Sequence, residues 1–390
     1  MKRFFPIVAT PVHLGDLLPL PWRGGWRLRR RMNGLYRGQG SFFFSSGAAA
    51  LFMLLEALKR MHPDRTQVVM PVYTAASVLI AVRQAGLEPV LCDISLNDFN
   101  MDAGIVPRLV CDRTLAVIAT HLFGIPMDAI DRFAGGVREI TVIEDAAQAM
   151  GSLIGGEPAG SFAAASLFSF NRGKNLPAAG GGCVTVHRGD IAAAVAQVID
   201  HAGIGELRAR ERITACLANP AFAVAVRPWI YAVVRGLTRD LRERPSPQTV
   251  RVRRFSRYQS AVLDALLNRN ELYGRKRYEN GMRALDRLNA DHGLVLPSID
   301  LSRLRPAFNR LPVLVRDPGR LERIVHTLHE SGFETSRMYV PLHREFTDLG
   351  CDSGEFPNAE FFADHLVTVP CHPFMQRSDI DRMCKKIQNV

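Results

Sequence analysis

Short apolar runs alternate with amphipathic segments between residue 45 and about residue 202. An apolar run of four to eight residues is typical of a buried strand, whereas apolar positions three or four residues apart are typical of a helix. Helical patterns cover 45–58, 75–84 and 127–133, and we predict strands at 68–70, 89–93, 115–120, 140–144, 166–170 and 183–187. This alternation predicts an α/β fold with a mostly parallel central sheet covered by helices.

The pattern changes after residue 202. Residues 206–250 combine arginines with two apolar runs, 221–226 and 229–234, which are separated by Arg227 and Pro228. A transmembrane helix needs roughly 20 predominantly apolar residues, so no transmembrane segment is expected here. We predict a helical hairpin or a dimer contact instead.

The last third of the chain predicts a smaller C-terminal α+β domain. We therefore divide the chain into an N-terminal and large domain (1–205), an insertion (206–250) and the small domain (251–390). Within the small domain the patterns predict a long helical stretch over 258–288, a strand over 309–315 and helices over 318–331 and 379–387.

The chain is long and basic, with 390 residues, 47% hydrophobic content and a formal net charge of +11. This length exceeds the size at which a single core usually stops growing, which agrees with two domains. Arginines cluster at 23–37 and again at 239–257. Such clusters attract phosphates, nucleic acids, anionic lipid or acidic carrier proteins, although a solvated basic surface explains them equally well.

The seven cysteines are odd in number and contain no C-x-x-C pair, so neither disulfides nor a metal site are expected. The N-terminus starts like a signal peptide, but Pro6, Pro11, His13 and Asp16 come before any long apolar run. We therefore expect a cytoplasmic protein.

Lys174 and Asp145 are the candidate catalytic residues. Asp145 ends the apolar run 141–145, and Lys174 follows twenty-nine residues later. A lysine amine can form a Schiff base with the aldehyde of pyridoxal phosphate, and a carboxylate fixed at a strand end can keep the pyridine nitrogen protonated, so that the ring accepts electrons. A lone lysine after a strand is more often solvated, but Asp145 and the nearby hydroxyl of Ser169 favour the cofactor role.

The start of the predicted helix after Ser46 is a candidate phosphate site. Unpaired N–H groups and the positive end of the helix dipole attract anions, and Gly47 lets the backbone approach closely. Alone this signal is weak, because a serine and a glycine before an apolar helix are more often a simple N-cap.

A series of motifs, in this order and spacing, resembles the sugar aminotransferase family often called DegT/DnrJ/EryC1/StrS. The motifs are Ser46-Gly47-Ala48-Ala49-Ala50-Leu51, Pro71-Val72-Tyr73-Thr74, Glu88-Pro89-Val90 with Asp93, His121-Leu122-Phe123-Gly124, Glu144-Asp145-Ala146-Ala147-Gln148-Ala149, Ser169-Phe170 with Lys174-Asn175, Tyr339-Val340-Pro341-Leu342-His343, Asn358-Ala359-Glu360 and Val369-Pro370-Cys371-His372-Pro373.

The resemblance implies an aspartate aminotransferase-like fold (type I), a homodimer with shared active sites, and pyridoxal 5'-phosphate as the cofactor. It implies transfer of an amino group from glutamate, or sometimes glutamine, to a keto group of a nucleotide-linked sugar, as in polysaccharide biosynthesis. Nucleic acid is not an implied partner.

Site roles follow from the resemblance position by position. Lys174 would hold the cofactor and move the proton, and Asp145 would face the pyridine nitrogen. The implied ring and phosphate contacts are Gln148 for the ring or its 3-hydroxyl, and Ser169 with the backbone N–H groups of Gly47, Ala48 and Ala49 for the phosphate. His343 and Tyr339 are candidates for the substrate pocket, whereas His121 and His372 are interpreted as structural.

Three departures from the family pattern stand out. Ala48 replaces the usual threonine but keeps its N–H group. Ala75 replaces the ring-stacking aromatic residue, so Tyr73 or another group must cover the cofactor. In the segment expected to reach the partner's cofactor phosphate, Arg254 keeps the cation but the asparagine is lost.

Three hypotheses on function remain open. The first is a nucleotide-sugar aminotransferase. The second keeps the chemistry but uses a non-sugar or carrier-bound carbonyl substrate, which the apolar insertion and basic clusters would suit. The third is a catalytically silent regulatory relative, against which the intact Lys174 argues.

Overall fold

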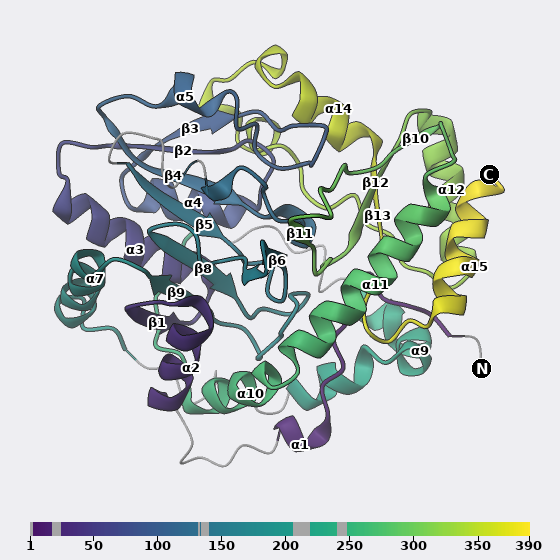
Figure 1. Cartoon of the computed structure of the whole chain (residues 1–390), viewed down its shortest axis with the longest axis horizontal. Helices are drawn as coiled ribbons and strands as arrows, with labels where there is room; N and C mark the ends of the chain where they lie inside the picture. Colours follow the sequence, from purple (N-terminus) through teal and green to yellow (C-terminus); the bar gives the residue numbers. More distant parts are fainter. Residues whose placement is uncertain (1–2, 18–24, 132, 134–139, 206–218, 240–247) are drawn as a thin grey trace.

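The computed structural model describes residues 3–17, 25–131, 133, 140–205, 219–239 and 248–390 (Figure 1). A seven-stranded sheet forms the centre of the larger part. Its order is β1-β9-β8-β5-β4-β2-β3, and only β9 runs against the other strands. The strands are β1 Gly40–Phe44, β2 Gln67–Pro71, β3 Glu88–Cys92, β4 Thr114–Thr120, β5 Thr141–Asp145, β8 Ala165–Ser169 and β9 Gly182–Val186.

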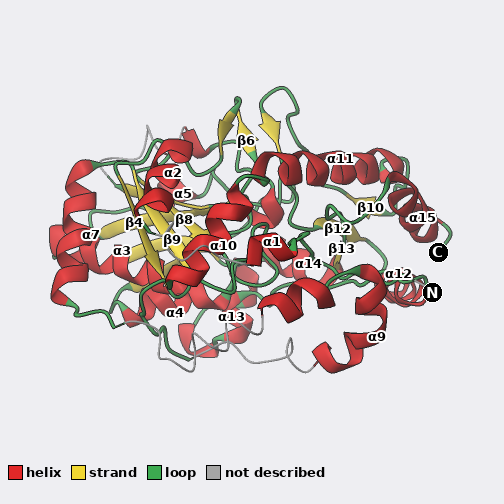
Figure 2. Ribbon diagram, turned by 90° about the horizontal axis from the view of Figure 1, so that it is seen from below, coloured by secondary structure: helices red, strands yellow, loops and turns green. Residues whose placement is uncertain are grey.

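Helices cover both faces of this sheet (Figure 2). Val68 and Met70 pack into one apolar cluster while Val69 between them packs into the other, as the period-two alternation of a strand requires. The first cluster includes residues of α3 Gly47–Met61, α4 Ala76–Gln84 and α7 Gly189–His201. The second includes residues of α2 Trp26–Tyr36, α5 Val106–Leu109 and α10 Arg257–Leu267.

A second, antiparallel sheet of order β10-β12-β13 lies on the side of the molecule opposite α3 and α7 (Figure 1). Its strands are β10 Leu294–Val295, β12 Leu311–Val315 and β13 Leu366–Val369. The helices of this part are α11 Asn270–Leu288, α12 Pro318–Glu330, α13 Leu342–Glu345, α14 Pro357–His365 and α15 Arg377–Gln388.

The remaining elements are short. A three-stranded ribbon of order β11-β6-β7 comprises Leu304–Arg305, Leu153–Ile154 and Glu157–Pro158. The others are α1 Leu14–Leu17 and the single 3-10 turns η1 Leu122–Gly124, η2 Thr347–Leu349 and η3 Ser353–Glu355.

The six predicted strands of the central sheet are confirmed, each within one residue at either end. The seventh strand, β1, was missed because its sequence Gly40-Ser41-Phe42-Phe43-Phe44 lies before the region of clear alternation. The helical pattern over 258–288 is wrong as one helix, because α10 and α11 are separate. The predicted helix over 127–133 begins only at residue 130 among the described residues.

The insertion is partly helical. Residues 219–225 are helical and are followed by α9 Pro228–Arg239, so the helical content predicted for this segment is present where the chain is described, while a hairpin or a dimer contact stays a prediction. The flanking segments 206–218 and 240–247 lie outside the described residues. α9 packs on the N-terminal segment, where the Phe4 N–H donates to the Pro228 carbonyl (3.0 Å), and on the segment after α12, where Tyr231 donates to Glu334 (2.9 Å). Every helix in the described part is too short or too polar to span a bilayer.

Candidate active site

Three neighbouring strands end in one row and place the candidate residues there. Thr120 at the end of β4 is opposite Asp145 at the end of β5, and Asp145 is opposite Leu167 in β8. Ser169 follows Leu167 by two residues and ends β8. Ligands of α/β enzymes bind at the carboxyl ends of such strands, so this edge is the candidate active site.

Asp145 presents a buried carboxylate at this edge, with 4% of its surface exposed. Its Oδ1 accepts a hydrogen bond from the Ala147 N–H at 3.0 Å. Burial raises the pKa of Asp145, while the N–H of Ala147 and the amine of Lys174 oppose the rise. The ionised form of such a buried carboxylate is stabilised by an additional cation or N–H donor.

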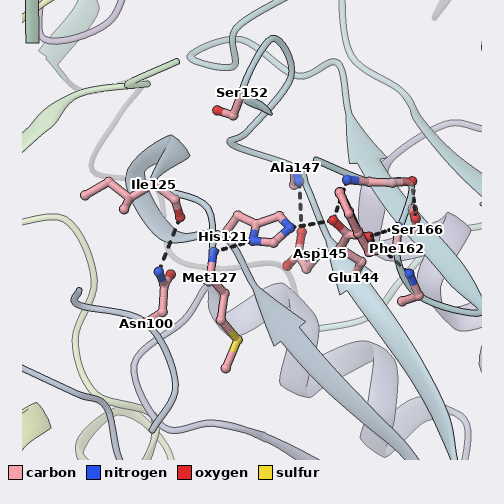
Figure 3. Close-up of polar contacts among 12 residues, drawn as sticks. Asn100, His121, Ile125, Met127, Glu144, Asp145, Ala147, Ser152, Phe162 and Ser166 are labelled. Carbon is pink, nitrogen blue, oxygen red and sulfur yellow. Dashed lines mark hydrogen bonds and ion pairs between the residues drawn. The ribbon is translucent and has the colours of Figure 1, made fainter. Parts of the chain in front are cut away.

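A second buried acid, Glu144, precedes Asp145 on the same strand, β5 (Figure 3). Glu144 pairs with the His121 imidazole, 2.7 Å between Oε1 and Nε2, and both side chains are fully buried. Because the Met127 N–H donates to His121 Nδ1 (2.9 Å), the proton lies on Nε2 and is donated to Glu144. Burial alone would raise the pKa of Glu144, but His121 and backbone N–H donors such as Phe162 hold it below its usual value.

These contacts agree with the structural role predicted for His121. His372 is also structural, since it is fully buried and its Nε2 lies 3.0 Å from the Pro6 carbonyl oxygen.

Lys174 lies on the loop between β8 and β9, and it is half-buried. Burial lowers the pKa of its amine to about 8; Asp145 opposes the shift and Arg310 adds to it. An amine with this pKa has a far larger neutral fraction near physiological pH than an ordinary lysine, and imine formation requires the neutral amine.

The residues beside Lys174 are tied to distant parts of the chain. The Asn175 side chain donates to the carbonyls of Met150 and Ala307, both at 2.9 Å. The Asn309 side chain donates to the Gly173 carbonyl and to Asn175 Oδ1, both at 3.0 Å. These bonds fix the backbone on both sides of Lys174.

The candidate phosphate site is assembled from two elements. Ser46 caps α3, accepting a hydrogen bond from the Ala49 N–H at 3.0 Å. The start of this helix lies directly against Ser169, because a Cβ built on Gly47 would come 3.3 Å from Ser169 Cβ. With the Ala49 N–H donating to Ser46, the first-turn donors for a phosphate are the N–H groups of Gly47 and Ala48.

Gln148, Tyr339 and Tyr73 form a hydrogen-bonded chain across the site. The Gln148 amide donates to the Tyr339 hydroxyl (3.2 Å), the Tyr339 N–H donates to the Tyr73 hydroxyl (3.2 Å), and Tyr73 donates to the Arg337 carbonyl (3.3 Å). The Tyr73 ring is 1% exposed and meets Phe362 edge-on at 4.8 Å. Tyr73 therefore supports Tyr339 instead of offering an open ring face to a cofactor.

His343 and Arg254 lie apart from the other candidate site residues. The His343 imidazole bonds Glu360 (2.5 Å) and lies 5.1 Å from the Phe356 ring, so it faces α14. Arg254 is exposed and its Nε donates to the Ile204 carbonyl at 3.0 Å. Within its own chain Arg254 also pairs with Phe44, at the end of β1.

Sequence reasoning missed Asn309 and Arg310, which the structure places beside the Lys174 loop. The available signal was a pair of polar residues immediately before the apolar run 311–315, but that position alone does not indicate a contact with a loop some 135 residues earlier in the chain.

The group of residues fits pyridoxal phosphate. Among the described residues, no hydrogen-bond donor reaches the buried Gln148 Oε1, so this oxygen would be available to the cofactor's 3-hydroxyl. The Asp145 carboxylate can accept the ring N–H, Lys174 can hold the aldehyde carbon, and Ser169 with the start of α3 can hold the phosphate.

The mostly parallel sheet with one reversed strand is the fold of the type I pyridoxal phosphate enzymes, and the lysine and the buried carboxylate at its edge suit that cofactor. The chain belongs to the DegT/DnrJ/EryC1/StrS aminotransferase family, whose model matches residues 37–388. It is therefore an aminotransferase with pyridoxal phosphate as its cofactor.

The individual relatives described next share between 17% and 27% sequence identity with this chain. The chain is 27% identical over 358 residues to dTDP-3-amino-3,4,6-trideoxy-alpha-D-glucose transaminase of Micromonospora megalomicea subsp. nigra, covering 88% of this chain and 83% of the relative. Helicobacter pylori PseC, an aminotransferase involved in the biosynthesis of pseudoaminic acid, has a TM-score of 0.77 at 17% identity, covering 100% of this chain and 99% of that one. The putative sugar aminotransferase Spr1654 from Streptococcus pneumoniae has a TM-score of 0.76 at 19% identity, covering 100% and 98%. The two structures show a shared fold.

Proposed function

We propose that this aminotransferase transfers an amino group from glutamate, or glutamine, to a keto group of a nucleotide-linked sugar. The observation that carries the proposal is the pairing of Lys174, with its lowered pKa, and the buried carboxylate of Asp145 at one sheet edge. The relative from Micromonospora megalomicea, a transaminase named for a dTDP-linked amino sugar, supports the nucleotide-sugar substrate.

Bound pyridoxal phosphate supplies an aldehyde that accepts the amino group and a ring that withdraws electrons. Asp145 would accept a hydrogen bond from the ring nitrogen and keep it protonated. Lys174 would hold the aldehyde until the substrate arrives, and its amine, with a pKa of about 8, would then take and return a proton at the reacting carbon. The Asn175 and Asn309 bonds keep this amine in place while the proton moves.

The decisive experiment incubates the purified enzyme with glutamate and a nucleotide-linked keto sugar and detects the amino sugar by mass spectrometry. Asp145→Asn should keep bound cofactor but lose most turnover, because a neutral amide does not hold the ring proton. Turnover near that of the wild type in Asp145→Asn would contradict the role of this carboxylate, and a failure of all keto sugars would contradict the substrate class.

A second candidate is an aminotransferase that acts on a non-sugar or carrier-bound carbonyl compound. The observation behind it is the exposed face of α9, where Trp229 and Val233, one helical turn apart, are 49% and 67% exposed. Large exposed apolar side chains gathered on one face mark contact surfaces more often than isolated ones do.

Two further properties belong to the proposal. We place Arg254 in the phosphate site of a partner subunit within a homodimer, as the family resemblance implies, and its exposed position leaves it accessible to a second chain. We also place the enzyme in the cytoplasm, where nucleotide-linked sugars are made.

A further inference from the structure

The N-terminal segment carries a buried threonine that reaches the loop of Lys174. Thr10 is 2% exposed, and its hydroxyl donates to the Asn175 carbonyl at 3.0 Å. Asn175 directly follows Lys174, so a hydrogen bond from the start of the chain fixes the backbone beside the proposed catalytic amine. The two bonded residues are 165 positions apart in the sequence, and only the folded chain brings them together.

Two side chains of α11 anchor the residues on either side of Thr10. The Tyr273 hydroxyl donates to the Pro11 carbonyl at 2.7 Å, and the Arg277 guanidinium donates to the Ala9 carbonyl at 2.9 Å. Figure 1 shows this part of the chain, in purple, running beside α11. Because both neighbouring carbonyls are bound to one helix, Thr10 is held at a fixed position against the lysine loop.

Arg277 also sets the direction of the Thr10 hydroxyl. This arginine is fully buried, and its Nη2 donates to Thr10 Oγ1 at 2.9 Å. A guanidinium group has donors only, so the threonine oxygen accepts from it and the hydroxyl proton points to the Asn175 carbonyl. A hydroxyl that accepts from a cation is polarised and donates more strongly in turn. The bond to Asn175 is therefore strengthened by a charge located in α11.

The same guanidinium reaches the lysine loop by a second route. Arg277 Nη1 donates to the Asn309 carbonyl at 3.2 Å, and the Asn309 side chain donates to Asn175 Oδ1 at 3.0 Å. Burial lowers the pKa of Arg277 to about 10, which leaves the group charged at physiological pH. One buried cation thus bonds both Thr10 and Asn309, and each of these bonds Asn175.

We infer that Thr10, oriented by Arg277, is a positioning residue that holds the Lys174 loop through the Asn175 carbonyl. Catalytic groups act efficiently only when they are held in the productive geometry, and a displacement of about 1 Å can lower a rate by about 100-fold. The inference rests on the proposed role of Lys174 as the residue that holds the cofactor. It adds the N-terminal segment to the parts of the chain that build the active site.

The test follows the attachment of pyridoxal phosphate to the apoprotein. In this step the Lys174 nitrogen bonds the aldehyde carbon and the aldehyde oxygen leaves as water, and the change in absorbance gives the rate constant and, by titration, the dissociation constant. Thr10→Val keeps the shape of the side chain but removes the hydroxyl. It should slow attachment and weaken cofactor binding, each by about fivefold or more, because a charge-assisted hydrogen-bond chain is lost.

Two further variants separate the hydroxyl from the packing of the side chain. Thr10→Ala removes the same hydroxyl without placing a methyl group against the Arg277 guanidinium, and it should match Thr10→Val. Thr10→Ser keeps the hydroxyl and should lie closer to the wild type than to Thr10→Val in both constants.

Thr185→Val is the matched control. Thr185 is fully buried in β9, and its hydroxyl oxygen lies 3.0 Å from that of Ser41. The substitution should lower the free energy of unfolding in urea, as Thr10→Val does, but it should leave the rate of cofactor attachment and the dissociation constant unchanged.

Three outcomes would overturn the inference. The first is unchanged attachment and affinity in Thr10→Val and Thr10→Ala. The second is attachment as slow in Thr10→Ser as in Thr10→Val, which would assign the effect to packing. The third is equal slowing in Thr185→Val, which would assign it to a general loss of stability.

Lys174→Ala separates a failure of this inference from a failure of the proposed function. Attachment that persists in Lys174→Ala would contradict the role of Lys174 and overturn the inference with it. Attachment that is lost in Lys174→Ala but normal in the Thr10 variants would overturn the inference alone.

Discussion

The side chains of Asn309 and Asn175 meet at 3.0 Å, Nδ2 to Oδ1, and both residues are buried. Asn175 directly follows Lys174, the proposed catalytic lysine, whereas Asn309 precedes the middle strand of the second sheet. The lysine loop is therefore held by a part of the chain that lies far from it in sequence. Its position depends on the packing of the second sheet as well as on the strands that flank it.

Asn309→Ala should loosen the lysine loop. It leaves Asn175 Oδ1 and the Gly173 carbonyl without their shared donor, so we expect the free energy of unfolding to fall by about 1–3 kcal/mol and turnover to fall with it. Denaturation in urea and a steady-state assay measure the two effects. Asn289→Ala, at the exposed C-terminal end of α11, should change neither. A stable Asn309→Ala enzyme with full activity would show that the contact is dispensable.

Lys174→Met should stabilise the apoprotein at neutral pH. The wild-type amine is protonated below its folded pKa of about 8, and keeping that charge buried destabilises the fold. The destabilisation is complete below about pH 8 and disappears as the pH rises to the unfolded value near 10.4. We expect Lys174→Met to raise the free energy of unfolding by about 1–3 kcal/mol at pH 7 and by less at pH 10. Urea denaturation at both pH values tests this, and an equal gain at both would argue against a buried charged amine.

Hybrid dimers test the proposed placement of Arg254. Lys174→Ala and Arg254→Ala subunits should each be inactive alone. If Arg254 completes the partner's phosphate site, mixing them should restore part of the activity, because one site of the mixed dimer then carries neither change. Subunit exchange is confirmed by mass spectrometry of the mixture. Full exchange without recovered activity would place Arg254 in the site of its own chain or outside both sites.

The exposed face of α9 separates the two candidate functions. Trp229→Ser with Val233→Ser should leave stability and the cofactor spectrum unchanged, since exposed substitutions alter stability by less than about 0.5 kcal/mol. If the enzyme is a nucleotide-sugar aminotransferase, the double variant should also retain turnover of a nucleotide-linked keto sugar. A loss of turnover seen only with a carrier-bound acceptor would support the second. Leu272→Ser, which changes an exposed leucine on α11 (59% exposed), is the control.

The sequence was sufficient to predict which residues lie at the candidate sheet edge. Lys174, Asp145 and Ser169 were identifiable because each ends or follows a buried strand, and the strand ends could be predicted from alternation. The roles of Tyr73 and His343 could not be predicted, because both depend on which residues of the second sheet region pack beside them. Asn309 and Arg310 were missed for the same reason, since their contacts cross a long stretch of sequence.

The reversed direction of β9 has a consequence for how the enzyme can be altered. Because β9 starts at the edge where β8 ends, residues 170–181 leave the sheet and return to it at the same place, as Ser169 pairs with Gly182. A Cβ at Gly182 would come 2.4 Å from the Gly47 backbone, so the return point has no room to shift. Extra residues in this hairpin loop would displace Lys174 itself. The parallel crossovers elsewhere in the sheet can lengthen without moving Lys174, so new sequence is more easily accommodated there during evolution or engineering.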